Sequence, residues 1–187
     1  MKRKTDPEKI AEGVRLIIEG IGEDIHRDGI VDTPSRVSDF WMELTEGYDG
    51  EPDDILTILP GDGHNEVVIV RGIEFASVCE HHLAPFIGVC DLAYLPGKDG
   101  IVGISKLGRL VDLFAKRLQV QERLTGQIAD ALFNSAKAAG VIVRIRASHT
   151  CMTMRGVKKV GSETVTIAKR GVFKTNLAEA NQLLAQF

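Results

Sequence analysis

This sequence lacks long apolar runs, and it lacks a surplus of basic residues. No stretch approaches the roughly 20 apolar residues that a membrane-spanning helix needs, and the start MKRKTDPEKI turns acidic where a secretory signal would be apolar. The net charge of −3 argues against a general nucleic-acid binder, because such domains carry a basic excess that displaces counterions from phosphates. We therefore expect a cytoplasmic protein with no membrane or nucleic-acid partner, while a local basic pocket for a small anion stays open.

Cysteine is also scarce. Cys79, Cys90 and Cys151 form an odd and sparse set, unlike the even and dense sets of disulfide scaffolds. In a reducing compartment they are thiols, free or bound to metal.

The composition is that of an ordinary globular protein, with 44% hydrophobic and 26% charged residues. A chain of 187 residues can bury one core, so we expect one compact unit. Within it, an N-terminal helical arm over residues 1–50 precedes a main region over 51–187.

Apolar periodicity predicts two N-terminal helices, a largely extended region, two more helices, and then two strands before a short terminal helix. Because this order shows no regular alternation of strand and helix, it indicates an α+β fold with an antiparallel sheet backed by helices. The predicted helices cover residues 7–24, 34–45, 106–118, 121–139 and 176–187, and the predicted extended segments cover 66–104, 141–147 and 162–168.

The tetrapeptide CEHH places a thiol and two imidazoles together at residues 79–82. Zinc prefers thiolate and imidazole ligands, and the Cys-x-x-His spacing lets Cys79 and His82 close on one ion. His81 lies between them in register and is free for acid–base chemistry. Taken alone, a single CxxH is also compatible with a structural or accidental pair.

A second half of the site is found in SHTC. His149 and Cys151 are two residues apart on a predicted strand, so both side chains project from one face, roughly 6 to 7 Å apart. Cys151 can complete the metal site with His149 beside it. Three protein ligands leave a fourth position open, which is typical of catalytic zinc. The alternative is a closed structural site with Cys90 as fourth ligand, although a thiol in the middle of GVCDLAY is more often a buried core residue.

Basic residues indicate a phosphate pocket. Lys106 and Arg109 share one face at a helix start that Ser105 can cap, where free N–H groups favour anions. If the strand through His149 stays regular, Arg155 lies roughly 13 Å from it, which approximates the reach from a purine ring to a triphosphate. A bulge near Gly156 would break this register, and a solvated basic face is the alternative.

Gln121 and Glu122 begin another predicted helix. A carboxylate can accept two N–H bonds from the N1 and 2-amino edge of guanine, which adenine cannot offer. The alternative is ordinary acidic charge at a helix N-terminus.

Together these stretches resemble the GTP cyclohydrolase I family. The resemblance spans residues 30–173, whereas the segments before residue 30 and after residue 175 are only loosely similar. It is carried by DTPSRV, CEHHLAPFIG, YLPG, GISKLGRLV, RLQVQERLTGQIADAL, SHTCMTMRGV, SETVT and GVF.

The resemblance implies a tunnelling fold in which an antiparallel four-stranded sheet carries helices on one face, with the N-terminal helices added. It further implies a homodecamer of two pentamers with active sites at subunit interfaces, in which residues 51–187 form the catalytic region. The implied reaction is the zinc-dependent opening of the guanine imidazole ring of GTP with release of formate. Rearrangement to 7,8-dihydroneopterin triphosphate follows, as the first step of pteridine and tetrahydrofolate biosynthesis.

The resemblance also implies roles for single residues. The zinc ligands are expected to be Cys79, His82 and Cys151, and His149 is expected to protonate N7 of the base. Later proton transfers are expected to use His81 and Ser105. Glu122, helped by Gln121, resembles the guanine anchor, and the triphosphate clamp is expected to comprise Arg36, Lys106, Arg109 and Arg155. Asp39 stands where some members carry a phosphate-contacting lysine, which weakens the assignment of Arg36.

Two other functions stay open at this point. One is a relative on the same scaffold with a different pterin or deazapurine-pathway product, which only product analysis separates. The other is a non-catalytic nucleotide-binding oligomer with a structural zinc, which would bind GTP without turnover. The nitrile-reducing enzymes of this fold use a cysteine nucleophile without zinc, so CEHH and HTC argue against them.

Overall fold

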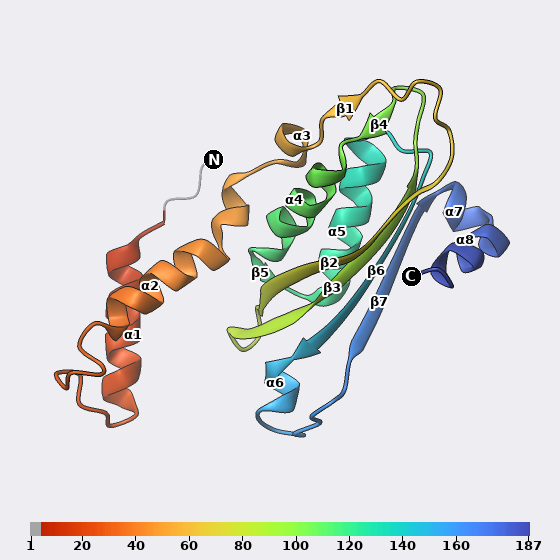
Figure 1. The fold of residues 1–187 in the computed structure, drawn as a ribbon. Helices are drawn as coiled ribbons and strands as arrows, with labels where there is room; N and C mark the ends of the chain where they lie inside the picture. Colours follow the sequence, from red (N-terminus) through yellow and green to blue (C-terminus); the bar gives the residue numbers. More distant parts are fainter. Residues whose placement is uncertain (1–4) are drawn as a thin grey trace.

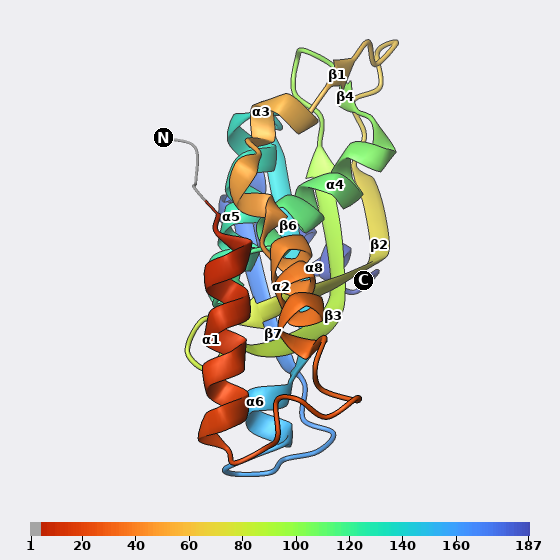
Figure 2. The same ribbon diagram turned by 90° about the vertical axis from the view of Figure 1, so that its left-hand side faces the viewer.

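A long curved sheet forms the body of the protein, and helices lie on both of its sides (Figure 1). The computed structural model describes residues 5–187. The first helices are set beside the sheet, and the last ones lie against its far side (Figures 1 and 2). The predicted α+β class is confirmed.

The main sheet has five strands in the order β5-β2-β3-β6-β7, instead of the four expected. The four long strands pair antiparallel, as predicted, and the short β5 adds a parallel pairing to β2. A separate pair joins β1 and β4. Residues 101–102 of β4 lie within the predicted extended segment 66–104, whereas β1 was not foreseen because a two-residue strand carries no periodicity. The strands are β1 (Ile58–Leu59), β2 (Val68–Cys79), β3 (Ala84–Leu95), β4 (Ile101–Val102), β5 (Leu118–Gln119), β6 (Gly140–His149) and β7 (Thr164–Gly171).

The helices fall into an N-terminal pair, a central pair and short C-terminal pieces. The hydroxyl of Ser38 donates to the carbonyl of Pro7 at 2.8 Å, which ties the first two helices together. No helix in residues 5–187 is long and apolar enough to cross a membrane. The helices are α1 (Pro7–Gly20), α2 (Thr33–Leu44), the 3-10 turn η1 (Glu46–Asp49), α3 (Pro52–Ile55), α4 (Ile104–Ala115), α5 (Gln121–Asn134), α6 (Thr150–Thr153), α7 (Val172–Thr175) and α8 (Leu177–Leu184).

The main core lies between the sheet and the pair α4 and α5. The alternation predicted for β6 is confirmed, since Val141, Val143, Ile145 and Ala147 are all buried on this side. The helical stripe predicted on α4, which includes Leu110 and Val111, is buried against them. Each fully buried aliphatic side chain contributes roughly 1.5 to 3 kcal/mol, so this layer provides much of the stability.

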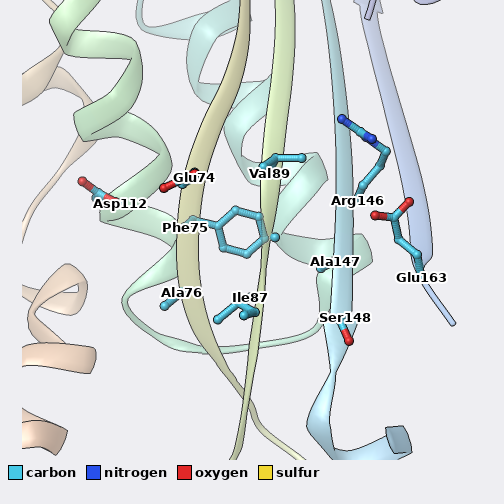
Figure 3. Close-up of a pocket in the computed structure, with 11 residues that line it drawn as sticks. Glu74, Phe75, Ala76, Ile87, Val89, Asp112, Arg146, Ala147, Ser148 and Glu163 are labelled. Carbon is cyan, nitrogen blue, oxygen red and sulfur yellow. The ribbon is translucent and has the colours of Figure 1, made fainter. Parts of the chain in front are cut away.

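The second face of the sheet is only partly covered, and the expectation of helices on one face alone is wrong. Ile142, of opposite parity to the core residues of β6, packs with Phe173 of α7 and with Ala180 and Leu183 of α8. Beyond these helices the second face holds an open cavity of about 710 Å³ (Figure 3). Among its lining residues are Glu74, Ile87, Val89, Arg146, Ser148 and Glu163.

One boundary error bears directly on the site. The strand was expected to continue through residues 149–155, but β6 ends at His149 and a helical turn, α6, follows. The neighbouring strands explain this, because β3 pairs with β6 only as far as Phe86 opposite His149, and β7 only as far as Thr164 opposite Ala147. Past His149 the backbone has no ladder partner on either side, so it closes hydrogen bonds within a turn.

Two helix boundaries also differ from the prediction. The helix expected from 106 begins at Ile104 with Gly103 as N-cap, so Ser105 lies inside its first turn and makes no capping bond. The helix expected to reach 139 ends at Asn134, since Lys137 adopts a left-handed φ of 52° and Ala139 donates to the carbonyl of Leu95 as the chain enters β6.

Candidate active site

A cavity of about 230 Å³ lies at the end of the sheet where the β2–β3 turn meets α6 and the start of α5. The larger cavity on the open sheet face has neither a cysteine nor a histidine in its lining, so the metal-ligating chemistry gathers in the smaller one. Its lining residues are Cys79, His81, His82, Gln119, Val120, Gln121, Glu122, His149, Cys151, Met152 and Thr164.

Three ligands expected for a metal converge in this cavity. One ligand atom each from Cys79, His82 and Cys151 lies within 4.8 Å of the others. Tetrahedral zinc holds thiolate and imidazole ligands about 3.5 to 3.8 Å apart, as its bond lengths of about 2.3 and 2.0 Å require. The distance of 3.9 Å between Cys79 Sγ and His82 Nδ1 is close to this value. Both the donor chemistry and the spacing therefore fit zinc.

A tight turn after β2 brings the first two ligands together. Cys79 is the last residue of the strand, and its carbonyl accepts from the backbone N–H of Leu83 at 2.9 Å. Leu83 has a left-handed φ of 52°, which reverses the chain into β3. The Glu80 carboxylate pairs with the Arg123 guanidinium, and this hydrogen bond lowers the pKa of Glu80. The turn is thereby fastened to α5.

His81 lies closer to the ligand cluster than its place in the sequence suggested. Its Nδ1 is 3.8 Å from Cys79 Sγ, while its side chain is exposed. Within residues 5–187, however, the group whose ligand atoms all come together is Cys79, His82 and Cys151. His81 therefore remains available at the mouth of the cavity.

Cys151 joins the cluster by a route that the sequence did not indicate. It lies in α6 and not on a strand, and the hydroxyl of Thr150 anchors this turn to the carbonyl of Pro85 at 2.6 Å. Burial raises the pKa of the Cys151 thiol, and the adjacent Cys79 raises it further. Two thiolates this close need a cation between them, which is the setting that a zinc ion supplies.

Cys90 takes no part in the cluster. It is fully buried in the apolar core of β3, where it faces Ile73 and Ile145 on the neighbouring strands, and burial raises its pKa strongly. The alternative of a closed site with three cysteines and one histidine is therefore wrong for this arrangement. The expectation of a buried structural thiol is confirmed.

His149 stands beside the metal ligands at the end of β6. Burial lowers the pKa of its imidazole, and the nearby charge of Glu122 opposes that shift in part. Its Nε2 is 2.7 Å from Oε1 of Gln121. The ring is therefore held on one edge, and its burial favours the neutral form.

Gln121 and Glu122 occupy the first turn of α5 but differ in exposure. The Glu122 side chain is exposed and lines the cavity, as a base-binding carboxylate should. Gln121 is buried, and its amide nitrogen contacts the carbonyls of Ile145 and Thr164. Only Glu122 of this pair keeps a side chain free to meet a ligand.

The residues expected to hold phosphates are not assembled by one chain. The hydroxyl of Ser77, two residues before Cys79, donates to the carbonyl of Ala115, so the end of α4 lies close to the cavity. Ser105 lies about 15 Å back along this helix, at 1.5 Å per residue. Figure 1 shows α4 beginning at the opposite end of the sheet from α6. Lys106 and Arg109 share that distant start of α4, and none of the three lines the cavity.

Arg155 and Arg36 have different surroundings. Arg155 lines a neighbouring cavity of about 690 Å³ together with His82 and Cys151. The expected path to Arg155 along a strand is wrong, because the helical turn α6 follows His149. Arg36 is exposed on α2, where it pairs with Asp32 at 3.5 Å.

Three residues of the site's surroundings were not foreseen. Phe86 packs against His149, and Thr125 and Thr166 contact each other beside Gln121. The strand pattern around FIGVC could have identified Phe86 as buried, since the alternate residue Ile87 is exposed. No sequence signal links Thr125 to Thr166, because they meet only when α5 packs on β7.

Sequence comparisons match this chain to known proteins over nearly its whole length. The profile of a family described as GTP cyclohydrolase I matches residues 10–187. A GTP cyclohydrolase 1 of Caldanaerobacter subterraneus subsp. tengcongensis is 48% identical over 180 residues, covering 96% of each chain. That of Mycobacterium tuberculosis is 50% identical over 183 residues, covering 97% of this chain and 91% of the relative. Among solved structures, the apo form of an archaeosine synthase QueF-like protein matches 58% of this chain and 96% of its own, with 17% identity and a TM-score of 0.48.

Proposed function

The chain belongs to the GTP cyclohydrolase I family and is a hydrolase that acts on GTP, and we propose that it opens the guanine imidazole ring at the Cys79–His82–Cys151 cluster. Formate is released, and the remainder rearranges to 7,8-dihydroneopterin triphosphate. The observation that carries this proposal is the convergence of three zinc-type ligands, His149 and Glu122 in one cavity.

Cys79, His82 and Cys151 would hold the metal. Zinc with three protein ligands supplies Lewis acidity and an activated water at neutral pH. The two thiols must be deprotonated to bind it, so metal binding releases protons. Their proximity within 4.8 Å of His82 supports one shared ion.

His149 would move the proton that ring opening requires. Its ring borders the same cavity as the metal ligands, so a purine bound in this cavity would lie beside the imidazole. A group that alternates between acceptor and donor suits a reaction in which it would first take a proton from the attacking water and then deliver that proton to the leaving nitrogen. His81, exposed at the mouth of the cavity, would assist the later transfers of the opened ribose, together with Ser105.

Glu122 would anchor the base. Its carboxylate can accept from N1–H and from the 2-amino group of guanine, and both bonds are charge-assisted. Its side chain lines the cavity and is exposed at the first turn of α5. This contact favours guanine over adenine, which presents neither donor on that edge.

The triphosphate clamp would require a second subunit. Arg155 lies near Cys151 in the same chain, whereas Lys106, Arg109 and Ser105 lie at the far end of α4. A neighbouring subunit whose α4 start meets this cavity would bring them together. We propose the tunnelling fold and a decamer of two pentamers as the assembly that does so, with residues 1–50 as an arm and 51–187 as the catalytic region. Arg36, already paired with Asp32 and followed by Asp39, has the weakest support.

Incubation of the zinc-loaded protein with GTP tests the proposal. We expect formate and a fluorescent pterin triphosphate, after oxidation, in equal amounts. Formate without the pterin would indicate a relative that stops after ring opening. GTP binding without formate would indicate a nucleotide-binding oligomer and would overturn the proposal. The His149→Ala variant, loaded with zinc in the same way, serves as the control for contaminating activity.

A further inference from the structure

We infer that Gln121 is a positioning residue for His149: its side-chain oxygen accepts the Nε2 proton of His149 and leaves Nδ1 as the ring nitrogen that exchanges a proton with the substrate. The inference rests on the proposed role of His149 in ring opening and replaces the expectation that the Gln121 side chain contacts guanine. The geometry of one buried hydrogen-bond network carries it.

The Gln121 side chain lies inside the protein. It is 2% exposed and extends from the start of α5 across the ends of β6 and β7. Its Oε1 is 2.7 Å from His149 Nε2. Its amide nitrogen lies 3.2 Å from the carbonyl oxygen of Ile145 and 3.0 Å from that of Thr164.

The chemistry of these neighbours fixes which end of the amide is which. A backbone carbonyl can only accept a hydrogen bond, so the group that faces Ile145 and Thr164 must be the NH2. An amide turned around would point its oxygen at two carbonyl oxygens. Each buried group left without a partner costs roughly 1 to 3 kcal/mol, which strongly disfavours that orientation.

Two threonines give the network the same direction. The hydroxyl of Thr125 donates to the backbone carbonyl of Gln121 at 2.7 Å, which uses its only proton. Thr125 and Thr166 have their hydroxyl oxygens 2.6 Å apart, so Thr166 must donate to Thr125. Thr166 Oγ1, 3.1 Å from the Gln121 amide nitrogen, is then an acceptor for that NH2. The contacts of the Gln121 amide nitrogen with Ile145, Thr164 and Thr166 therefore all direct the NH2 end of the amide away from His149.

The tautomer of His149 follows from this direction. Because Gln121 offers an oxygen with no hydrogen, the neutral imidazole must carry its proton on Nε2. Nδ1 is left with its lone pair. Phe86 holds the plane of the ring, since its own ring stacks on the imidazole at 4.4 Å. Gln121 and Phe86, which do not contact the substrate, thereby determine that Nδ1 is the nitrogen of His149 that faces it.

The buried network also leaves Gln121 no spare group for a base. Its oxygen serves His149, and its NH2 serves the ends of β6 and β7. Of this pair, only Glu122 then discriminates guanine. Gln121 and Glu122 therefore affect different kinetic constants of the reaction.

Histidine labelled with 15N tests the tautomer directly in the zinc-loaded protein without GTP. Above the titration of His149 we expect the nitrogen shifts of the Nε2–H form, assigned by their disappearance in His149→Ala. Gln121→Met keeps the length of the side chain but offers no comparable acceptor, and we expect His149 to become a mixture of tautomers. An unchanged Nε2–H signal in this variant would overturn the inference.

Two further variants keep this test sharp if Gln121→Met folds poorly. Thr166→Val removes one fixing contact and should broaden or partly shift the His149 signals. Gln119→Met is the matched control, because Gln119 is equally buried two residues earlier and bonds Phe114, Gln127 and Arg123 without contacting His149. We expect it to leave the tautomer unchanged, and the same shift in both glutamine variants would contradict a specific role for Gln121.

The kinetic constants of formate release separate positioning from substrate binding. If Gln121 acts through His149, Gln121→Met should lower kcat about tenfold or more, within the range that general acid–base catalysis contributes, and leave KM for GTP nearly unchanged. A raised KM with kcat unchanged would instead return Gln121 to the guanine contact. If the wild-type protein released no formate, the proposed function would fail while the 15N spectra still decided the Gln121–His149 relationship.

Discussion

The imidazole of His149 lies flat against the phenyl ring of Phe86, with 4.4 Å between ring centroids and 9° between planes. The two residues are cross-strand partners at the last paired position of β3 and β6. Phe86 is itself fully buried and meets Phe75 edge-on at 5.9 Å. The proposed proton donor is therefore supported by the core at the point where the sheet ends.

Replacing Phe86 by leucine tests this support. The variant loses the stacked ring but keeps an apolar core residue, so we expect a loss of about 1 kcal/mol in the free energy of unfolding. Formate release should fall by about tenfold, because the orientation of His149 is no longer fixed. Urea unfolding and a formate assay measure the two effects. Unchanged turnover in a folded variant would show that the stack does not orient His149.

Cys151 and His149 should respond differently to truncation. Cys151→Ala removes one of three zinc ligands, so we expect the protein to lose zinc on dialysis. His149→Ala leaves the cluster intact and should retain zinc while ring opening stops. Metal analysis alongside the formate assay measures both. A zinc-free His149→Ala protein or an active Cys151→Ala protein would contradict the division of roles.

Arg155→Ala should weaken binding of the triphosphate more than that of the base. A charge-assisted bond contributes roughly 1.5 to 3 kcal/mol, so KM for GTP should rise by about tenfold or more. Binding of guanosine, which carries no phosphate, should hardly change. Arg36→Ala should have a smaller effect, because Arg36 already pairs with Asp32 in the chain. Equal losses for GTP and guanosine would show that Arg155 does not act on the phosphates.

The ion pair between Asp130 on α5 and Arg170 on β7 should contribute to stability in a pH-dependent way. The hydrogen bond from Arg170 lowers the pKa of Asp130, and the two groups are 2.5 to 3.0 Å apart. Because the pKa of Asp130 is lower in the folded than in the unfolded state, the ion pair stabilises the protein above the unfolded pKa of about 3.9. This stabilisation is lost as pH falls through the lowered folded-state pKa.

Arg170→Gln should therefore lose stability near neutral pH but not at the acid end. Because Asp130 is partly exposed, we expect only about 0.5 to 1 kcal/mol at pH 7. Urea unfolding from pH 2 to pH 7 should show the wild-type and variant curves converging below pH 3. A constant difference across that range would assign the effect to packing of the Arg170 side chain.

Local spacing was sufficient for one half of the site but not for the other. Cys79 and His82 are three residues apart in a turn, so their convergence could be predicted from CEHH alone. Cys151 joins Cys79 and His82 as expected but by a different path, because the expected strand is a helical turn. Whether a strand continues past His149 depends on where β3 and β7 stop, and that is a long-range property of the sheet.

The remaining differences have similar physical causes. Gln121 was expected to help Glu122 hold the guanine base because the family resemblance implies that role. Its burial depends on β6 and β7 offering carbonyl acceptors, which only the packed sheet provides. The separation of Ser105 from Cys79 within one chain follows from the direction of α4 along the sheet. A sequence motif does not reveal how far its residues lie from another motif in the folded chain.

The coordination of zinc in the loaded protein tests the central claim most directly. X-ray absorption at the zinc edge counts sulfur neighbours at about 2.3 Å and lighter neighbours at about 2.0 Å. We predict two sulfurs, one imidazole and one further light atom, with the sulfur count unchanged in Cys90→Ala and reduced in Cys151→Ala. Three sulfurs, or a spectrum that responds to Cys90, would contradict the open Cys79–His82–Cys151 centre.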